Sequence, residues 1–139
     1  MSRLAGKVAI ITGAARGMGA VTAKLFVEQG ASVVIADIID DAGETLAASL
    51  GDRAHYVHAD ISKESDWQNL IHKAESLGPL NVLVNNAAIL HVAAIADSDA
   101  ADYMRVININ QLGTYLGIRA AIEPMKKAGG GSIINISSI

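Results

Sequence analysis

Three glycines near the start of the chain, Gly13, Gly17 and Gly19, lie in the run TGAARGMG. The run follows an apolar stretch at residues 7–11 and precedes a helical pattern that ends at Gly30. Glycine lets a backbone approach a phosphate closely, and a helix N-terminus offers free N–H groups and a partial positive charge. A strand, a glycine turn and a helix in this order therefore predict a binding site for the pyrophosphate of a dinucleotide.

Asp37 is the acidic partner that such a site requires. It follows the second apolar run, 18 residues after Gly19, where a carboxylate can accept hydrogen bonds from the ribose hydroxyls of an adenosine. The same charge would repel a 2′-phosphate, which favours NAD over NADP. Arg16 acts against this preference, because a guanidinium beside the glycine turn could pair with a 2′-phosphate. We expect the carboxylate to outweigh the arginine, and the alternative is that Asp37 is a solvated loop residue.

Polar side chains also follow the third and fourth apolar runs. Asp60 is placed where a carboxylate could accept from the amino group of an adenine, or it could be a turn residue before the next helix. Asn85 and Asn86 lie in an apolar setting, where an unsatisfied buried amide costs roughly 1–3 kcal/mol. These amides therefore either join neighbouring strands or contact a ribose.

Strand and helix patterns alternate along the chain. Apolar runs predict strands at residues 7–12, 32–36, 54–58, 81–85 and 132–137. Periodic stretches predict helices at residues 17–29, 40–50, 63–77 and 99–127, with Asp40 and Ser62 as N-caps of the second and third helices. The alternation predicts one α/β domain over residues 1–139, a doubly wound parallel sheet of the Rossmann type with strand order 3-2-1-4-5. A ligand should bind at the switch point beside the first strand.

Composition excludes several classes of function. A chain of 139 residues with a net charge of −3 lacks the basic face that nucleic acid requires. It has no signal peptide pattern and no apolar run near the roughly 20 residues that span a bilayer. The absence of cysteine excludes disulfides and thiol catalysis and is consistent with a cytoplasmic protein. His55 and His58 lack partners at metal-ligand spacing, so we expect no metal site.

These motifs together resemble the short-chain dehydrogenase/reductase family, and the resemblance extends over all five predicted strands. The family pattern Thr-Gly-x-x-x-Gly-x-Gly matches residues 12–19. The pattern Asn-Asn-Ala-Gly matches residues 85–88, with Ala88 in place of the last glycine. Asn-x-x-Gly matches residues 110–113, and the family's fifth strand ending matches residues 131–138. Within the family, the chain looks most like the NAD-linked hydroxysteroid dehydrogenases.

The resemblance implies hydride transfer between NAD(H) and a secondary alcohol or ketone, steroid-like or alicyclic. It gives Ser138 the place of the catalytic serine and Asn110 that of the catalytic asparagine. The cofactor-binding residues expected from the motifs are Gly13, Arg16, Gly17, Met18, Gly19, Asp37, Ile38, Asp60, Ile61, Asn86, Ala87 and Ala88. The resemblance also implies a homo-oligomer, a tetramer or dimer, with the long helix ending at Lys127 as a contact face.

One family motif has no match here. The Tyr-x-x-x-Lys pair that donates and takes the proton lies downstream of the serine in the family. Tyr115 has Arg119 at that spacing but precedes the last strand, so we expect it to be a packing residue. We therefore expect that the natural protein continues beyond residue 139 with further strands, and that the 139-residue chain alone is inactive and exposes a sticky strand edge.

Two other functions compete with this one. A non-catalytic dinucleotide-binding fragment would need no proton donor. A methyltransferase-type domain that binds S-adenosylmethionine would also need an acid after the second strand, although the glycine spacing and the Asn85-Asn86 pair are against it. His91 lies in a loop near the expected mouth of the site and could line a substrate pocket.

Overall fold

The apolar runs form a five-stranded parallel sheet in the computed structural model, which describes residues 2–138. The strands are β1 (Val8–Thr12), β2 (Ser32–Asp37), β3 (Ala54–His58), β4 (Leu80–Asn85) and β5 (Ser132–Asn135). Their order is β3-β2-β1-β4-β5, as predicted, and every neighbouring pair is parallel. The order of winding therefore changes between β1 and β4, which is where a doubly wound sheet binds its ligand.

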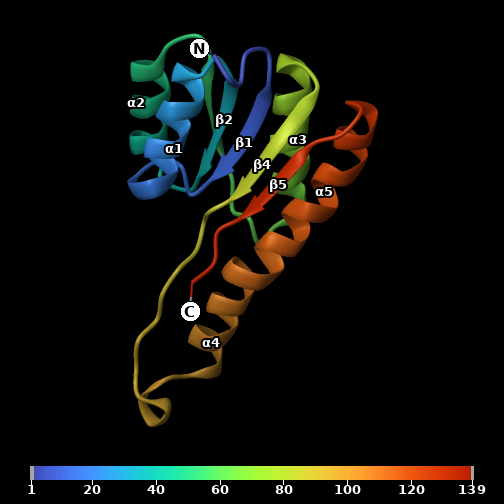
Figure 1. Ribbon diagram of the computed structural model, residues 1–139. Coiled ribbons are helices and arrows are strands. Elements are labelled where there is room, and N and C mark those ends of the chain that lie inside the picture. Colours follow the sequence, from blue (N-terminus) through green and yellow to red (C-terminus); the bar gives the residue numbers. More distant parts are fainter. Residues whose placement is uncertain (1, 139) are drawn as a thin grey trace.

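Helices cover both faces of the sheet (Figure 1). On one face lie α1 (Gly17–Glu28) and α2 (Asp40–Leu50); on the other lie α3 (Glu64–Leu77) and α5 (Gly113–Lys127). A strand covered on both faces must be apolar on both, and β1 is buried at all five positions. Successive side chains alternate between the two layers, so that Ile10 packs beneath α3 and α5 while Ile11 packs beneath α1.

Trp67 of α3 anchors the second layer. Its side chain is 1% exposed, and its indole Nε1 donates to the backbone oxygen of Ile61 at 2.9 Å. Burial of this ring therefore ties α3 to the segment that follows β3, which is part of the predicted site.

The predicted helix over residues 99–127 is not uniform. It consists of α4 (Ala100–Ile107), a π-helical turn η2 (Asn108–Leu112) and α5, and a short 3₁₀ helix η1 (Ile95–Asp97) precedes it. Asp99 is the N-cap of α4 and accepts from the Asp102 N–H at 2.8 Å. A π turn inside a helix changes which side chains share a face, and such turns are frequent at functional sites.

Both predicted N-caps are wrong. The N-cap of α2 is Ile39, and the Asp40 carboxylate instead accepts from Tyr56 of β3. The N-cap of α3 is Lys63, and the Ser62 hydroxyl donates to Asp60. In each case a partner from another segment, or an earlier residue of the same turn, has taken the polar group that could have capped the helix.

Strand β5 is an edge of the sheet, as predicted, and is shorter than the expected 132–137. Ile134 and Ile136 beside this edge are 40% and 46% exposed. Within residues 2–138, no helix is long and apolar enough to cross a membrane.

Candidate dinucleotide-binding site

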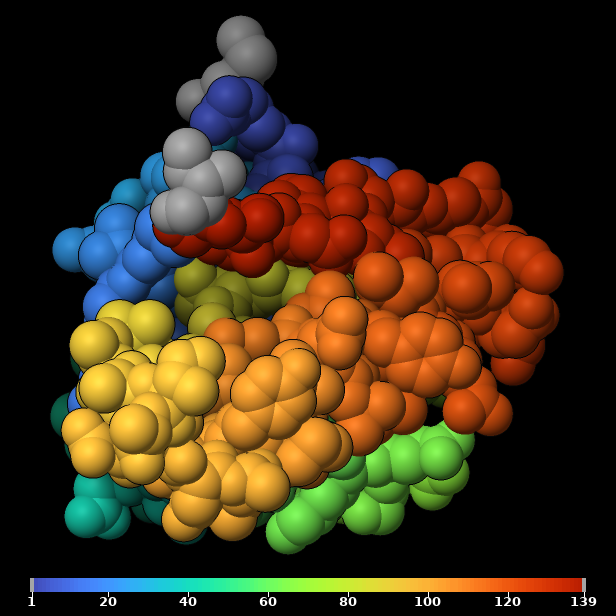
Figure 2. Space-filling model, turned by 90° about the horizontal axis from the view of Figure 1, so that it is seen from below, coloured from blue at the N-terminus to red at the C-terminus, as the bar shows by residue number. Residues whose placement is uncertain are grey.

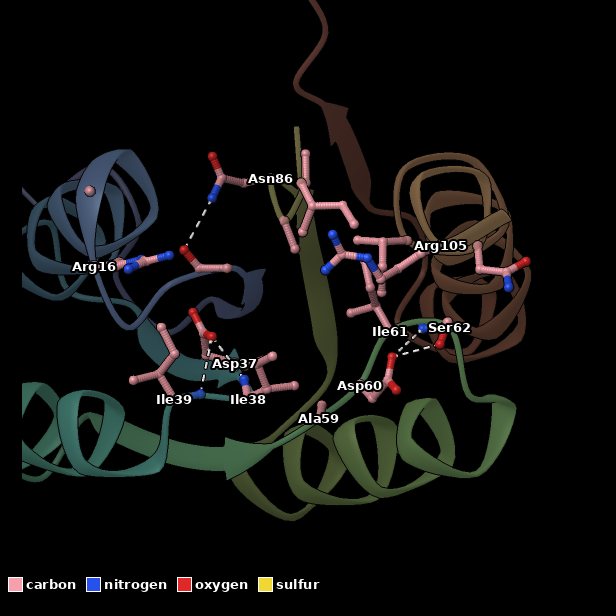
Figure 3. Close-up of a pocket in the computed structure, with 18 of the residues that line it drawn as sticks. Arg16, Asp37, Ile38, Ile39, Ala59, Asp60, Ile61, Ser62, Asn86 and Arg105 are labelled. Atoms are coloured by element: carbon pink, nitrogen blue, oxygen red, sulfur yellow. Dashed lines mark hydrogen bonds between the residues drawn. The ribbon is translucent and has the colours of Figure 1, made fainter. Parts of the chain in front are cut away.

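A cavity of about 670 Å³ lies at the carboxyl ends of the first four strands (Figure 3). Its walls come from the loops after β1, β2, β3 and β4 and from α4 with its π turn. The loop after β4 and α4, coloured yellow to orange, lie across the face of the molecule that Figure 2 shows. Ten of the residues predicted to bind a cofactor line it: Gly13, Arg16, Gly17, Asp37, Ile38, Asp60, Ile61, Asn86, Ala87 and Ala88. Met18 and Gly19 of α1 do not line the cavity.

The three glycines of the loop have three different roles. Gly13, at φ +63°, passes so close to β4 that an added Cβ would lie 2.8 Å from the Ala87 Cα. A Cβ at Gly19 would overlap the Gly13 oxygen and lie 2.7 Å from the Asn86 Nδ2. Gly17, at φ +58°, has nothing within 4 Å of an added Cβ, so its open side is the space that a phosphate can approach.

Electrostatics at this loop suit an anion. Arg16, the N-cap of α1, gives no side-chain hydrogen bond to the first turn, and that turn holds no acidic residue. The positive end of the helix dipole therefore meets no charge of opposite sign in that turn. The residues present fit the pyrophosphate of a dinucleotide.

The Asp37 carboxylate is held in place by backbone N–H groups rather than solvated in a loop. Its Oδ1 accepts from Ile38 N at 2.8 Å and from Ile39 N at 3.3 Å, and its Oδ2 accepts from Ala15 N at 3.0 Å. The carboxylate thus connects the turn after β2 to the glycine loop. It lies on the wall of the cavity with its charge fixed before any ligand arrives (Figure 3).

Asp60 is both a turn residue and a wall residue. Its Oδ1 accepts from the Ser62 hydroxyl at 2.6 Å and from the Ser62 N–H at 3.0 Å, and its Oδ2 lies 3.6 Å from the Lys63 Nζ. Burial raises the pKa of Asp60, but the Ser62 hydrogen bonds and the Lys63 charge outweigh burial and leave that pKa lowered. The carboxylate is therefore ionised in the neutral range, and both of its predicted roles remain compatible with the geometry.

The two asparagines at the end of β4 join neighbouring strands. The Asn85 Nδ2 donates to the Asn135 Oδ1 at 2.9 Å, and the Asn86 Nδ2 donates to the Thr12 oxygen at 2.9 Å. The Thr12 hydroxyl oxygen in turn accepts from the N–H groups of Asn86 and Ala87, each at 3.0 Å. The structure shows the first of the two roles that the sequence allows, and Asn86 also lines the cavity, where the second role stays a prediction.

Asn110 acts on the backbone of another segment. Its Oδ1 accepts from the Ile89 N–H and its Nδ2 donates to the Ile89 oxygen, both at 2.8 Å. The Asn110 amide, which lies in the π turn, thus forms hydrogen bonds with both backbone polar groups of Ile89 in the loop after β4. Neither Asn110 nor Ser138 lines the cavity; Ser138 is exposed in the segment after β5.

The wall that α4 supplies was not predicted from the sequence. Ala101, Met104, Arg105, Asn108 and Ile109 line the cavity, and the Arg105 guanidinium points into it opposite Arg16 (Figure 3). No residue within 2–138 gives that guanidinium a hydrogen bond or an ion pair. The spacing of residues 101, 105 and 109, one helical turn apart, is a signal that could have found this face.

Other candidates lie outside the cavity. His91 does not line it, and its Nε2 lies 3.6 Å from the Asp102 carboxylate of α4. Tyr115 is 57% exposed, so the prediction that it is a packing residue is wrong for residues 2–138. Those residues hold no group of three His, Cys, Asp or Glu side chains that could bind a metal.

A family model and individual relatives point to the same family of proteins. A family model described as short chain dehydrogenase matches residues 7–139. The chain is 49% identical over 138 residues to a 3-alpha-(or 20-beta)-hydroxysteroid dehydrogenase of Mycobacterium tuberculosis, covering 99% of this chain and 53% of that protein. It is 45% identical over 147 residues to a trans-4-hydroxycyclohexanecarboxylate dehydrogenase of Sinomonas cyclohexanicum, covering 99% and 56%. It is 44% identical over 142 residues to tropinone reductase-like 1 of Erythroxylum coca, covering 99% and 52%. The chain thus spans about half the length of the relatives it matches.

Proposed function

Because the chain belongs to the short-chain dehydrogenase family, we propose that it forms the cofactor-binding part of an enzyme that transfers a hydride between NAD(H) and a secondary alcohol or ketone. The observation that carries this proposal is the Asp37 carboxylate, fixed by three backbone N–H groups on the wall of the cavity beside the glycine loop. An acid at this place can accept from ribose hydroxyls. The glycine loop and the N-terminus of α1 fit the pyrophosphate of the same ligand.

Charge supports NAD rather than NADP. The Asp37 carboxylate would repel a 2′-phosphate across a short distance, whereas Arg16 on the same wall would attract one. A fixed carboxylate in contact with the ribose site is expected to dominate, since a guanidinium at the end of a flexible side chain can turn away.

The bound cofactor and the residues of the chain contribute different parts of the proposed reaction. When bound, NAD(H) supplies the hydride chemistry. Ser138 is proposed to donate a hydrogen bond to the substrate oxygen, where charge develops during hydride transfer. Asn110 is proposed to act through Ile89, because both polar atoms of its side chain are already bonded to that residue.

A substrate class can be proposed from the relatives. Their names include a hydroxysteroid dehydrogenase and a hydroxycyclohexanecarboxylate dehydrogenase, and both names denote alcohols with an alicyclic carbon skeleton. We propose an alicyclic or steroid-like secondary alcohol or ketone as the substrate of this protein as well.

We also propose a homo-oligomer, with the exposed side chains of Tyr103, Tyr115 and Ile122 along α4 and α5 as the contact face. Sedimentation that shows a monomer would contradict this proposal.

The first test is binding and turnover in the intact protein. Calorimetry should give a lower Kd for NADH than for NADPH, and NAD should be reduced with a cyclic secondary alcohol such as a cyclohexanol or a hydroxysteroid. Binding of neither dinucleotide would overturn the proposal. Binding without turnover of any alcohol in the panel would support the non-catalytic alternative.

A further inference from the structure

Tyr56 of β3 makes contacts that the proposed function does not use. Its ring packs against Gly43 of α2, where an added Cβ would collide with the ring edge and lie 2.9 Å from the Cζ. Its hydroxyl lies 2.6 Å from the Asp40 Oδ1 and 2.8 Å from the Asp37 backbone oxygen. The side chain thus reaches from β3 to the connection between β2 and α2.

The hydroxyl shares its single proton between two acceptors, and these lie at the two ends of one turn. Asp37 is the last residue of β2 and Asp40 is the first residue of α2. Two residues, Ile38 and Ile39, separate them, and α2 has no side-chain hydrogen bond at its N-cap. A helix start that lacks a cap of its own depends on outside contacts for its position, and the Tyr56 hydroxyl is such a contact.

Charge keeps this contact in place. Burial and the Asp40 hydrogen bond raise the pKa of Tyr56 well above its ordinary value, so the hydroxyl remains a donor in the neutral range. The hydrogen bonds from Tyr56 and His58 lower the pKa of Asp40, which therefore remains an anionic acceptor. The His58 Nδ1 lies 2.7 Å from the same Asp40 oxygen, on the solvent side.

The turn that Tyr56 holds is the one that presents the Asp37 carboxylate. Two of the three N–H groups that orient this carboxylate belong to Ile38 and Ile39, inside the turn. A change in the backbone of residues 37–40 would therefore move the donors and the carboxylate together.

We propose that Tyr56 is a positioning residue, which holds the turn of residues 37–40 so that the Asp37 carboxylate meets the adenosine ribose and rejects a 2′-phosphate. Tyr56 does not line the cavity and would act only through Asp37. The proposal rests on the proposed function, and it adds a residue that sets the choice between the two dinucleotides.

The test is Tyr56→Phe in the intact protein, which removes the hydroxyl and leaves the ring on Gly43. Calorimetry would give Kd values for ADP-ribose and for its 2′-phosphate, neither of which depends on catalysis. The preference of the wild type for ADP-ribose should fall by about three- to tenfold in the variant, the range expected for one hydrogen bond. The loss should come from weaker ADP-ribose binding, while the 2′-phosphate form binds as well as before or better. General damage to the fold would weaken both ligands and leave their ratio unchanged.

Matched variants complete the design. Ser49→Ala also removes a hydroxyl that donates to a backbone oxygen, that of Leu46 in the last turns of α2, outside the cavity, and should leave both Kd values unchanged. Asp40→Asn retains an oxygen acceptor for the Tyr56 hydroxyl and should lower the preference for ADP-ribose less than Asp40→Ala does. If Tyr56→Phe does not fold, the comparison of these two Asp40 variants tests the inference in its place. An unchanged ratio in Tyr56→Phe, or in Asp40→Ala where that variant decides, overturns the inference while the proposed function stands. A wild type that binds neither ligand overturns the proposed function itself.

Discussion

At the scale of single residues, Asp37 can be tested by removing its charge. In Asp37→Ser, NADH should bind about 10- to 100-fold more weakly, because hydrogen bonds to a charged group contribute about 1.5–3 kcal/mol. NADPH should bind more tightly than it does to the wild type, since the repulsion of a 2′-phosphate is gone. Calorimetric Kd values for both ligands check this result.

Asp41→Ser is the matched control for that prediction. Asp41 lies in the first turn of α2, is exposed and does not line the cavity, so this variant makes the same change of charge nearby. If the two variants shift the preference for NADH over NADPH equally, the shift arises from the change in net charge, and Asp37 does not contact the ribose.

Gly17 and Gly6 separate backbone strain from phosphate binding. Both have positive φ, +58° and +73°, and an added Cβ meets nothing within 4 Å at either position. Alanine should cost about 1–2 kcal/mol of stability at each position through the left-handed backbone alone. Only Gly17→Ala should weaken NADH, by tenfold or more, because only its Cβ enters the space that a phosphate approaches. Melting curves together with NADH titrations measure the two effects, and equal binding losses in both variants would contradict this role of the loop.

Residue types and spacing predicted much of this site, because a phosphate loop constrains the local backbone. Gly13, Gly17 and Asp37 could be recognised from their order after strands. The wall from α4 could not be recognised in this way. Arg105 belongs to no motif, and it lies at the cavity only because the long connection after β4 brings α4 back over the site. The dual role of Asp60 also depends on where Ser62 and Lys63 lie in space.

At the scale of elements, the Asn110 amide should fix the loop after β4. Asn110→Ala removes the acceptor for the Ile89 N–H and the donor to the Ile89 oxygen. The Ile89 amide should then exchange its hydrogen at least about tenfold faster, since loops open locally when their hydrogen bonds are lost. Exchange followed by NMR tests this, with the Ile10 amide of buried β1 as an internal reference.

Asn108→Ala is the matched variant, because Asn108 lies in the same π turn and makes no hydrogen bond to Ile89. Ile89 should remain protected in that variant. Equal acceleration in both variants would mean that the π turn as a whole, rather than the Asn110 amide, holds the loop.

The strands were predictable as elements because both faces of each inner strand are buried, which demands continuous apolar runs. Helix starts were less predictable. Asp40 and Ser62 have the right types for caps, but tertiary partners took both side chains. The π turn was also invisible in the sequence, because a single-residue change of hydrogen-bond register leaves the apolar periodicity of residues 99–127 almost unchanged.

At the scale of the whole molecule, the sheet has an apolar core on each of its two faces. For this reason the alternation of strand and helix patterns in the sequence was enough to predict the strand order. The right-handed crossover rule leaves few ways to connect five parallel strands. The winding reversal beside β1 then brings four loops to one edge, and the cavity is a consequence of that topology. Within residues 2–138, β5 is the last strand in this order, and Ile134 and Ile136 beside it are exposed.

Stability of the molecule should decrease as the pH falls from 7.5 to 5, and His55 of β3 should account for part of that decrease. Burial, and then the positive charge of Lys73, lower the pKa of His55 below its ordinary 6.5. The unfolded chain therefore binds a proton near pH 6.5 that the folded chain resists. The contribution of neutral His55 is fully present above pH 6.5 and is lost as the pH falls through the folded pKa. The lowered pKa values of Asp40 and Asp60 act in the same direction, but only near and below their ordinary 3.8.

His55→Gln isolates this contribution, because glutamine is polar, similar in size and without a proton to gain in this range. The melting midpoint of His55→Gln should fall less between pH 7.5 and 5 than that of the wild type. His72→Gln, on the exposed side of α3, should retain the wild-type slope and controls for the loss of one of the four histidines. Calorimetric scans of the three proteins in matched buffers measure the slopes. If His55→Gln and the wild type lose the same number of degrees, then β3 accommodates the charged imidazolium, and the pH dependence arises from groups elsewhere in the molecule.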